Sequence, residues 1–470
     1  MGYSFKRILP MKMLVVLGCI LLAFGVGMSA TNQLLHAELW HLAFVMLSIF
    51  IALFIQASNP VFLVPYIIFV WAVFPEIRRI LDYLFQEYSN TPLLALAPLI
   101  VNLTLLIPIS RNFHRISTNV KKIVIVFALA LIYGLAIGFI NYGIAALYEF
   151  TNYATGLLLF IYINICDLGN ETRERWLRSL SFIGVGIAMY GIYQYFYLPP
   201  WDQFWMINSE MLSIGAPEPL SVRVFSTLNS PGPAGVFLTM VLGFMIVQKK
   251  WRSFGIIGVL IVLLAVLLTL VRSAWIGLVV MLLAYLYRAK SIDKIKLFFL
   301  FGAGILLYLF ILPNLSGAQN ITNRMSTFTT MNEDVSFNER LSFSTNIVTT
   351  ILSNPIGRGL GATGLGTKLY SNASSYQSFD NGYLNLFYTF GLIGGLAVIG
   401  SLFALLVPLM RERRKGNDYA DLSFAGLGAL LFLMLSVNVL TGVSGVILWF
   451  IISVGFYQQR SPQANPTESV

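Results

Sequence analysis

The stretch "FGIIGVLIVLLAVLLTLVRSAWIGLVVMLLAYLY", residues 254–287, is an apolar run interrupted by a single charge, Arg272. As one α-helix it would be about 51 Å long, which exceeds the roughly 30 Å hydrocarbon layer of a bilayer. The run is therefore predicted to form two membrane helices joined by a tight turn at Arg272–Ser273. This turn places Arg272 at or slightly below the outer surface of the membrane.

The composition of the whole chain agrees with a membrane location. Of its 470 residues, 57% are hydrophobic and only 11% are charged, and the mean hydropathy is +0.78. A soluble protein of this size needs a more charged exterior, so these values predict a polytopic membrane protein. The two cysteines, Cys19 and Cys166, lie in or beside apolar segments, so neither a disulfide framework nor a metal site is expected.

Apolar segments long enough to span a bilayer recur from end to end, which predicts an all-α protein with about 12–14 transmembrane helices. The first segment follows basic residues and is interpreted as an uncleaved membrane helix rather than a signal peptide. The lower number applies if two short or polar segments are re-entrant or interfacial. The predicted spans are 11–30, 40–57, 60–75, 92–109, 122–140, 142–166, 178–198, 231–248, 254–271, 274–287, 297–313, 383–409, 421–440 and 443–457.

The net charge of +10 reflects topology. With the N-terminus inside, most of the 30 lysines and arginines fall in loops assigned to the cytoplasm, as the positive-inside rule requires. Both termini are then cytoplasmic, and no nucleic-acid partner is expected. Arg78 and Arg79 are among the few basic residues assigned to outer loops.

The chain is interpreted as a single polytopic membrane domain, residues 1–470, with two long external loops. The loop at 199–230 is rich in Trp, Phe and Met, which suits a segment on the membrane surface. The loop at 314–380 is the largest hydrophilic segment. It has helical potential over residues 337–355, with Pro355 and Gly357 as a stop signal.

Arg272 and Arg223 each precede a predicted helix on the outer side of the membrane. An arginine near the hydrocarbon needs an anionic or carbonyl partner. One alternative is that Arg272 extends to lipid headgroups and that Arg223 only pins its loop. The other is that both bind the phosphates of a membrane-borne substrate, for which the planar guanidinium is suited.

The glycine-rich stretch "GRGLGATGLG", residues 357–366, contains a GxGxxG spacing. No strand precedes it and no βαβ unit surrounds it, so it is not a dinucleotide-binding fingerprint. Its glycines are expected to shape a loop, and its backbone amides are candidates for holding an anion.

Four segments together resemble the bacterial O-antigen ligase and O-antigen polymerase superfamily. They are "RVFSTLNSPGPAG" from Arg223, "LTLVRSAWIGL" around Arg272, the loop segments "NRMSTF" and "NERLSFSTNIVTTILSNPIGRGLG", and "DNGYLNLFYTFGLIGGL" from Asp380. Their order and spacing fit this superfamily over about residues 220–400. The N-terminal half is similar only as a succession of apolar helices.

The resemblance implies a GT-C-like glycosyltransferase of the plasma membrane that needs neither metal nor cofactor and acts on the external face. It implies that Arg223 and Arg272 hold the diphosphate of a glycan carried on undecaprenyl diphosphate. Arg340 is the better candidate in the large loop for contacting donor phosphate or acceptor sugar, whereas Arg324 is expected to pair with acidic residues of that loop. Tyr376 and Tyr383 are possible sugar contacts.

Asp380 and Asn381 are the predicted catalytic pair. Ligases of the superfamily typically carry a His where this chain has Asp380, and none of the three histidines lies in the large loop. Asp380 either accepts the proton of the acceptor hydroxyl or caps the helix that begins near Tyr383. Asn381 is expected to orient the acceptor hydroxyl or the loop itself.

The leading functional prediction is a polymerase that joins lipid-linked repeat units into a surface polysaccharide: an O-antigen, a capsule or an exopolysaccharide. The first alternative is a ligase that passes finished glycan to a lipid or protein acceptor. A lipid-linked glycan transporter is the second, although transporters concentrate polar groups at the bilayer midplane. The expected partners are the donor and acceptor glycans, membrane lipids, and a flippase and chain-length regulator of the same pathway.

Overall fold

The computed structural model describes residues 37–166, 169–287, 294, 319–326, 335–370 and 379–456. Within these ranges the chain is helical and has no strand, apart from an isolated antiparallel bridge between Gly215 and Val222. The predicted all-α polytopic class is therefore confirmed. The predicted spans at 11–30 and 297–313 lie outside the described residues.

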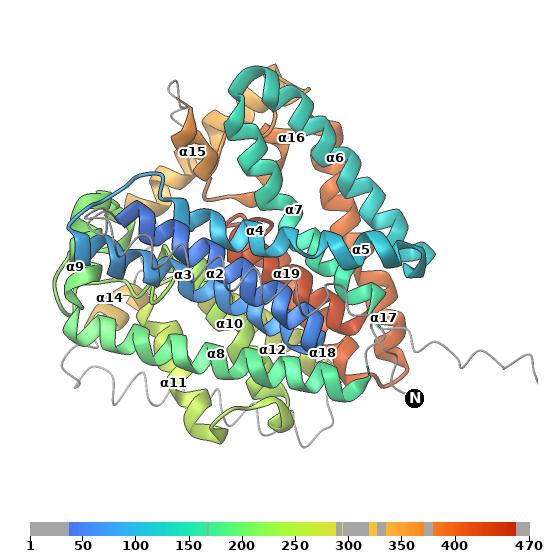
Figure 1. The fold of residues 1–470 in the computed structure, drawn as a ribbon, viewed down its shortest axis with the longest axis horizontal. Helices are drawn as coiled ribbons and strands as arrows, with labels where there is room; N and C mark the ends of the chain where they lie inside the picture. Colours follow the sequence, from blue (N-terminus) through green and yellow to red (C-terminus); the bar gives the residue numbers. More distant parts are fainter. Residues whose placement is uncertain are drawn as a thin grey trace, which may run out of the picture.

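The helices run in chain order through one bundle (Figure 1). The first seven are α2 (Ala37–Ser58), α3 (Leu63–Phe85), α4 (Ala97–Leu103), α5 (Leu106–Asn112), α6 (Thr118–Tyr142), α7 (Ile144–Ile165) and α8 (Asn170–Tyr197). The others are α9 (Pro200–Ser209), α10 (Pro231–Val247), α11 (Gly255–Leu268), α12 (Arg272–Leu286), α14 (Gln319–Ser326), α15 (Val335–Ser353), α16 (Gly382–Ala404), α17 (Leu406–Arg414), α18 (Asp418–Leu433) and α19 (Gly442–Gly455).

Six helical segments among the described residues are long and apolar enough to cross a membrane: Glu38–Ser58, Pro60–Phe85, Leu93–Arg115, Thr118–Tyr142, Ile144–Ile165 and Gly382–Arg414. Four apolar helices are shorter, namely α10, α11, α12 and α19. The apolar run at 254–287 is divided into two helices as predicted, but the turn lies at residues 269–271 and not at Arg272–Ser273, because α11 ends at Leu268 and α12 begins at Arg272. Leu270, between them, has a left-handed φ of +54°.

The predicted span 60–75 is too short. Helix α3 continues through Pro75 to Phe85, so Arg78 and Arg79 lie in a helix and not in an outer loop. Arg79 is fully buried. The prediction failed because charges ended the apolar window, whereas the charges are neutralised inside the bundle by Glu76, Asp82 and Asp202.

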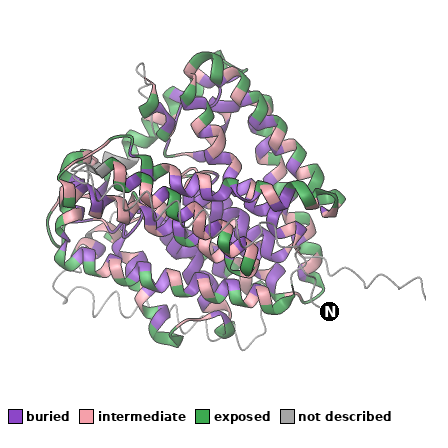
Figure 2. Cartoon of the chain, viewed as in Figure 1, coloured by how far each residue is buried: buried purple, intermediate pink, exposed green. Residues whose placement is uncertain are grey.

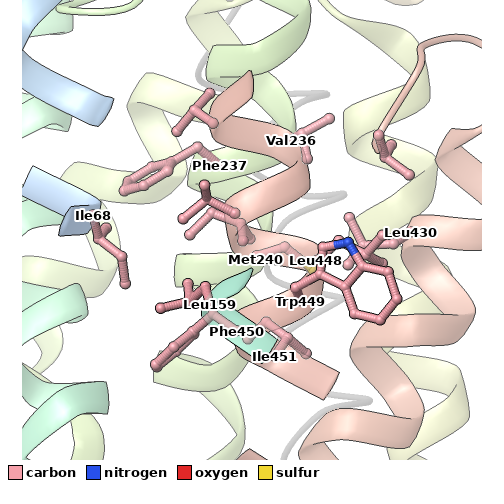
Figure 3. Close-up of a cluster of buried hydrophobic side chains, with 14 of the residues drawn as sticks. Ile68, Leu159, Val236, Phe237, Met240, Leu430, Leu448, Trp449, Phe450 and Ile451 are labelled. Atoms are coloured by element: carbon pink, nitrogen blue, oxygen red, sulfur yellow. The ribbon is translucent and has the colours of Figure 1, made fainter. Parts of the chain in front are cut away.

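The centre of the bundle is α19. Its residues from Val443 to Gly455 are all buried, as expected for a helix that is apolar on every side. Trp449 lies with its ring 4.9 Å from Phe127 of α6 and 4.9 Å from Phe160 of α7. Figure 3 shows Trp449 and Ile451 among side chains of α7, α10 and α18, and Figure 2 shows the surrounding helices exposing their outer faces.

A glycine-rich loop, residues 354–370, enters this bundle between α6, α7 and α16. Helix α16 is interrupted at Gly391, whose φ is +71°. There the Leu392 amide donates to the Pro355 carbonyl at 2.9 Å, and the Tyr388 carbonyl accepts from the Arg358 amide at 2.9 Å. In a continuous helix those two groups would bond to each other. The backbone groups that the break in α16 frees are thus paired with backbone groups of the loop.

Gly359 is the position where the loop approaches α6 most closely. Its φ is +86°, and an added Cβ would lie 2.3 Å from the backbone nitrogen of Gly138. Its amide donates to the Thr389 carbonyl at 2.9 Å. The expectation that these amides hold a ligand anion is not met, because the amides of residues 358–360 are used by carbonyls of α6 and α16.

Gly359→Ala tests this close approach, with Gly416→Ala as the matched control. Gly416 has a similar φ of +82°, but nothing lies within 4 Å of an added Cβ. Both variants carry about 1–3 kcal/mol of backbone strain, and only Gly359→Ala adds a clash with backbone. We expect a clearly larger fall in the unfolding midpoint of the detergent-solubilised protein for Gly359→Ala. Equal falls would contradict the packing described here.

Candidate functional site

The turn between α11 and α12 presents the carbonyl oxygen of Leu270 to two arginines. Arg223 donates to it from Nη2 and Arg324 of α14 donates to it from Nε, each at 3.4 Å. Arg272 follows as the first residue of α12. Three arginines from separate parts of the sequence therefore meet around one turn.

Arg223 is the most enclosed of these arginines. Its Nη1 donates to the Ser213 carbonyl at 3.0 Å, while its Nε is buried with no hydrogen-bond partner among the described residues. Burial and then the positive charges of Arg324, Arg340 and Arg272 lower the pKa of Arg223, against the opposing charge of Asp380, to about 10 in all. These five side chains are thus close enough to act on one another electrostatically.

Asp380 forms an ion pair with Arg340 of α15. Asp380 Oδ2 lies 2.7 Å from Arg340 Nε, and the two side chains are 54% and 44% exposed. An ion pair that is half exposed to water contributes little to stability. Its presence here instead places a carboxylate beside the arginines, where an anionic ligand can compete for Arg340.

The capping role falls to Asn381 and not to Asp380. Asn381 Oδ1 accepts from the amides of Tyr383 at 3.0 Å and Leu384 at 3.2 Å, which are the free donors of the first turn of α16. The Tyr383 hydroxyl donates to the Leu431 carbonyl of α18 at 2.7 Å. Both side chains therefore have structural partners, and Tyr376 lies outside the described residues.

Two features of this region were missed by sequence reasoning. Arg324 directs its Nε to the turn that also holds Arg223, a contact that was not expected, whereas Glu333 and Asp334, two of the acidic residues expected to pair with it, lie outside the described residues. The sequence feature that could have indicated this contact is that Arg324 lies in the same loop as Arg340. Glu149 of α7 was noted only as a polar residue in a predicted span. Its buried carboxylate accepts from the Gly366 amide at 2.8 Å, so the anion held by the glycine-rich loop is part of the protein.

The aromatic residues of the loop at 199–230 are used for packing. Trp205 and Met206 of α9 form a small buried cluster with Phe225 and neighbouring apolar residues. The loop therefore forms packed structure beside the arginines.

A cavity of about 630 Å³ lies at the other end of the bundle, between the N-termini of α8 and α18 and the C-terminus of α17. Figure 1 shows α17 and α18 on the side opposite α9 and α14. Its charges pair with each other, since Lys250 lies 3.3 Å from Glu174 and 3.6 Å from Asp418, and Lys415 lies 2.6 Å from Glu412. This cavity lacks the positive excess found around Arg223.

The fold and the site together define a multi-pass membrane protein with an arginine-rich site at one end of its helical bundle. Residues 257–399 match the family model described as O-antigen ligase. The predicted resemblance to the O-antigen ligase and polymerase superfamily is confirmed over this segment, and it indicates an enzyme of that general kind. The segment contains Arg272, Arg324, Arg340, Asp380 and Asn381, whereas Arg223 precedes it. No curated protein matches the chain.

Asn381→Ala is expected to lower the stability of the protein by about 1 kcal/mol, because two helix amides lose their acceptor. Asn417→Ala is the matched control, since Asn417 Oδ1 caps α18 in the same way. Thermal unfolding of both variants should show similar losses, and Asn381→Asp should retain most of the cap. An unchanged midpoint for Asn381→Ala would mean that this cap does not stabilise α16.

Proposed function

We propose that the protein is a membrane glycosyltransferase that transfers glycan from undecaprenyl diphosphate to an acceptor hydroxyl. The observation that carries this proposal is the arginine cluster. Arg223, Arg272, Arg324 and Arg340 come from four separate segments, and among the described residues one carboxylate, Asp380, also acts on the charge of Arg223. Such an excess of positive charge fits a ligand with several negative charges.

A diphosphate suits the cluster for two reasons. Guanidinium groups remain charged and offer paired donors that match phosphate oxygens. Within the part of the chain that the structure describes, the buried Nε of Arg223 has no hydrogen-bond partner, so an oxygen of the ligand would complete its environment. Preorganised positive charge further stabilises the charge that develops on a departing diphosphate.

Asp380 supplies the base in this proposal. The acceptor hydroxyl oxygen attacks the anomeric carbon of the donor sugar and forms the new glycosidic bond. The bond between that carbon and the diphosphate oxygen breaks, and its electron pair leaves with the lipid diphosphate. The hydroxyl proton passes to the Asp380 carboxylate, whose Oδ2 lies 2.7 Å from Arg340 Nε.

We further propose that the acceptor is a fresh lipid-linked repeat unit, which makes the protein a polymerase. Ligases of the superfamily typically carry a histidine where this chain has Asp380. Neither described histidine supplies that group: His41 lies 3.2 Å from Asp82 between α2 and α3, and His114 lies in the short helix after α5. A ligase with the same donor and a different final acceptor is the alternative.

The location follows from the same reasoning. We place the protein in the bacterial plasma membrane, with the arginine cluster on the external face and both termini in the cytoplasm. The support is the predominance of basic residues at the end of the bundle away from α9 and α14, including the run Arg411, Arg413 and Arg414 in α17.

Asp380→Asn tests the base. It removes the proton acceptor while changing the side-chain shape little, so we expect glycan output to fall by about 100-fold or more. Asp418→Asn is the control, because Asp418 is similarly exposed and pairs with Lys250 at the other end of the bundle. Arg340→Gln removes the same ion pair but keeps the carboxylate, so it should mainly raise KM. Normal glycan output from Asp380→Asn would exclude the catalytic role.

The polymerase is distinguished from the ligase by the length of glycan on the undecaprenyl carrier. In a strain lacking this protein, gel electrophoresis and mass spectrometry should show carrier with single repeat units only. Long, undischarged chains on the carrier would identify a ligase instead. An unchanged carrier pool would contradict both forms of the proposal.

A further inference from the structure

A buried ionic cluster binds the segment that carries Arg223, and the proposed chemistry does not use this cluster. Arg79 of α3 donates from Nη2 to the Ser226 carbonyl at 2.6 Å and from Nη1 to the Leu228 carbonyl at 2.7 Å. Its Nε lies 2.9 Å from Asp202 of α9, and Glu76 also binds it. One guanidinium therefore joins α3, α9 and the turn at 225–228.

Gln194 of α8 completes the hold on this turn. Its Oε1 accepts from the amides of Phe225 at 3.2 Å and Ser226 at 2.8 Å, and its Nε2 donates to Asp202 at 2.7 Å. The Ser226 hydroxyl donates to the Ile187 carbonyl at 2.6 Å, and the Thr227 hydroxyl to the Ala72 carbonyl at 2.6 Å. The hydrogen bonds that hold the turn therefore all come from residues of α3 and α8.

The turn needs this support because its backbone is unusual. Ser226 has a left-handed φ of +55°, which costs free energy for a residue with a side chain. Such a conformation persists only where its surroundings determine it. The partners of Ser226 supply that determination, since its amide, its carbonyl and its hydroxyl are all bonded.

Stability alone does not account for the cluster. Arg79, Asp202 and Gln194 are all fully buried. Burial raises the pKa of Asp202, the charge of Arg79 opposes the rise, and the charge of Glu76 adds to it, so removing these groups from water has a cost that the ion pairs offset only in part. Apolar side chains of similar volume often replace such clusters with no loss of stability. Apolar side chains cannot make the hydrogen bonds by which Arg79 and Gln194 fix the turn.

The turn leads directly to the site. The Val224 amide donates to the Leu268 carbonyl at 3.0 Å, and the Arg223 amide to the Ile214 carbonyl at 2.9 Å. The backbone is thus fixed from residue 223 to residue 228, and the Arg223 guanidinium reaches the Leu270 carbonyl from that fixed base. A shift of the turn would move the guanidinium relative to the α11–α12 turn.

We infer that Arg79, assisted by Gln194, is a positioning residue that sets the Arg223 guanidinium for binding a lipid diphosphate. Arg79 does not touch the ligand and acts only through the turn at 225–228. This inference rests on the proposed diphosphate site and extends it to the N-terminal half of the chain, which lies outside the family match.

Arg79→Lys tests the inference, because it keeps the charge beside Glu76 and Asp202 but loses the planar fork that spans two carbonyls. Arg173→Lys is the matched control: Arg173 is also buried and donates to the Val454 carbonyl at 3.2 Å, at the other end of the bundle. Binding of undecaprenyl diphosphate to the purified full-length protein is the first measurement. We expect about tenfold weaker binding for Arg79→Lys and a change below about twofold for Arg173→Lys.

The double variant Arg79→Lys/Arg223→Lys separates positioning from general destabilisation. If Arg79 acts through Arg223, the double variant binds no more weakly than Arg223→Lys alone, because the two effects are not independent. Additive losses would overturn the inference. Undiminished binding by Arg79→Lys would also overturn it while leaving the proposed function intact.

Hydrogen exchange of the amides at 224–228 gives a readout that does not depend on the ligand. We expect faster exchange there in Arg79→Lys and no change in Arg173→Lys. If the wild-type protein fails to bind undecaprenyl diphosphate, the proposed function fails, and faster exchange in Arg79→Lys alone still supports the positioning of the turn. Unchanged exchange in Arg79→Lys would refute that positioning.

Discussion

Backbone amides and carbonyls that enter an apolar environment must find partners inside the protein, and two irregular segments of this chain depend on that requirement. The glycine-rich loop at 354–370 meets it by exchanging partners with α16 at Gly391. The turn at 225–228 meets it through the side chains of Arg79 and Gln194. Both segments support the arginine cluster. The bonds to the turn at 225–228 fix the backbone next to Arg223, and the glycine-rich loop packs against α16, the helix that Asn381 caps.

In the arginine cluster several positive charges lie near one another, whereas buried charges usually pair with charges of opposite sign. Burial and the like charges around Arg223 lower its pKa, and Asp380 opposes them, so a polyanion bound there would reduce the repulsion between the arginines. The buried cluster behind it is arranged in the opposite way, with two carboxylates around Arg79. Positive charges therefore predominate around Arg223, whereas the buried cluster around Arg79 contains its own carboxylates.

Much of the fold was predictable from the sequence because it depends on local pattern. Apolar runs predicted the main helices, the single charge at Arg272 predicted the break between α11 and α12, and Pro355 and Gly357 predicted the end of α15. The extension of α3 through Arg79 was not predictable, because Asp202, which helps neutralise it, is distant in sequence.

The candidate site was predicted in part for the same reason. Its arginines and Asp380 are recognisable by their positions at helix entrances and by the family resemblance, and the pairing of Asp380 with Arg340 adds a contact that no local pattern contains. The choice between Asp380 and Asn381 as the cap of α16 depends on backbone geometry at one residue. From the sequence, Asp380 was the candidate cap, and the structure gives that role to Asn381.

The contact between the glycine-rich loop and the early helices also constrains how the protein is made. Tyr133 bonds to the Ile356 carbonyl across 223 residues of chain, and Glu149 bonds to the Gly366 amide across 217. At about 5–20 residues per second, the ribosome needs roughly 10–40 s to bridge that gap. Throughout this interval Tyr133 and Glu149 lack these two partners. The contacts that hold the glycine-rich loop between α6 and α7 therefore form only when the last quarter of the chain is being made.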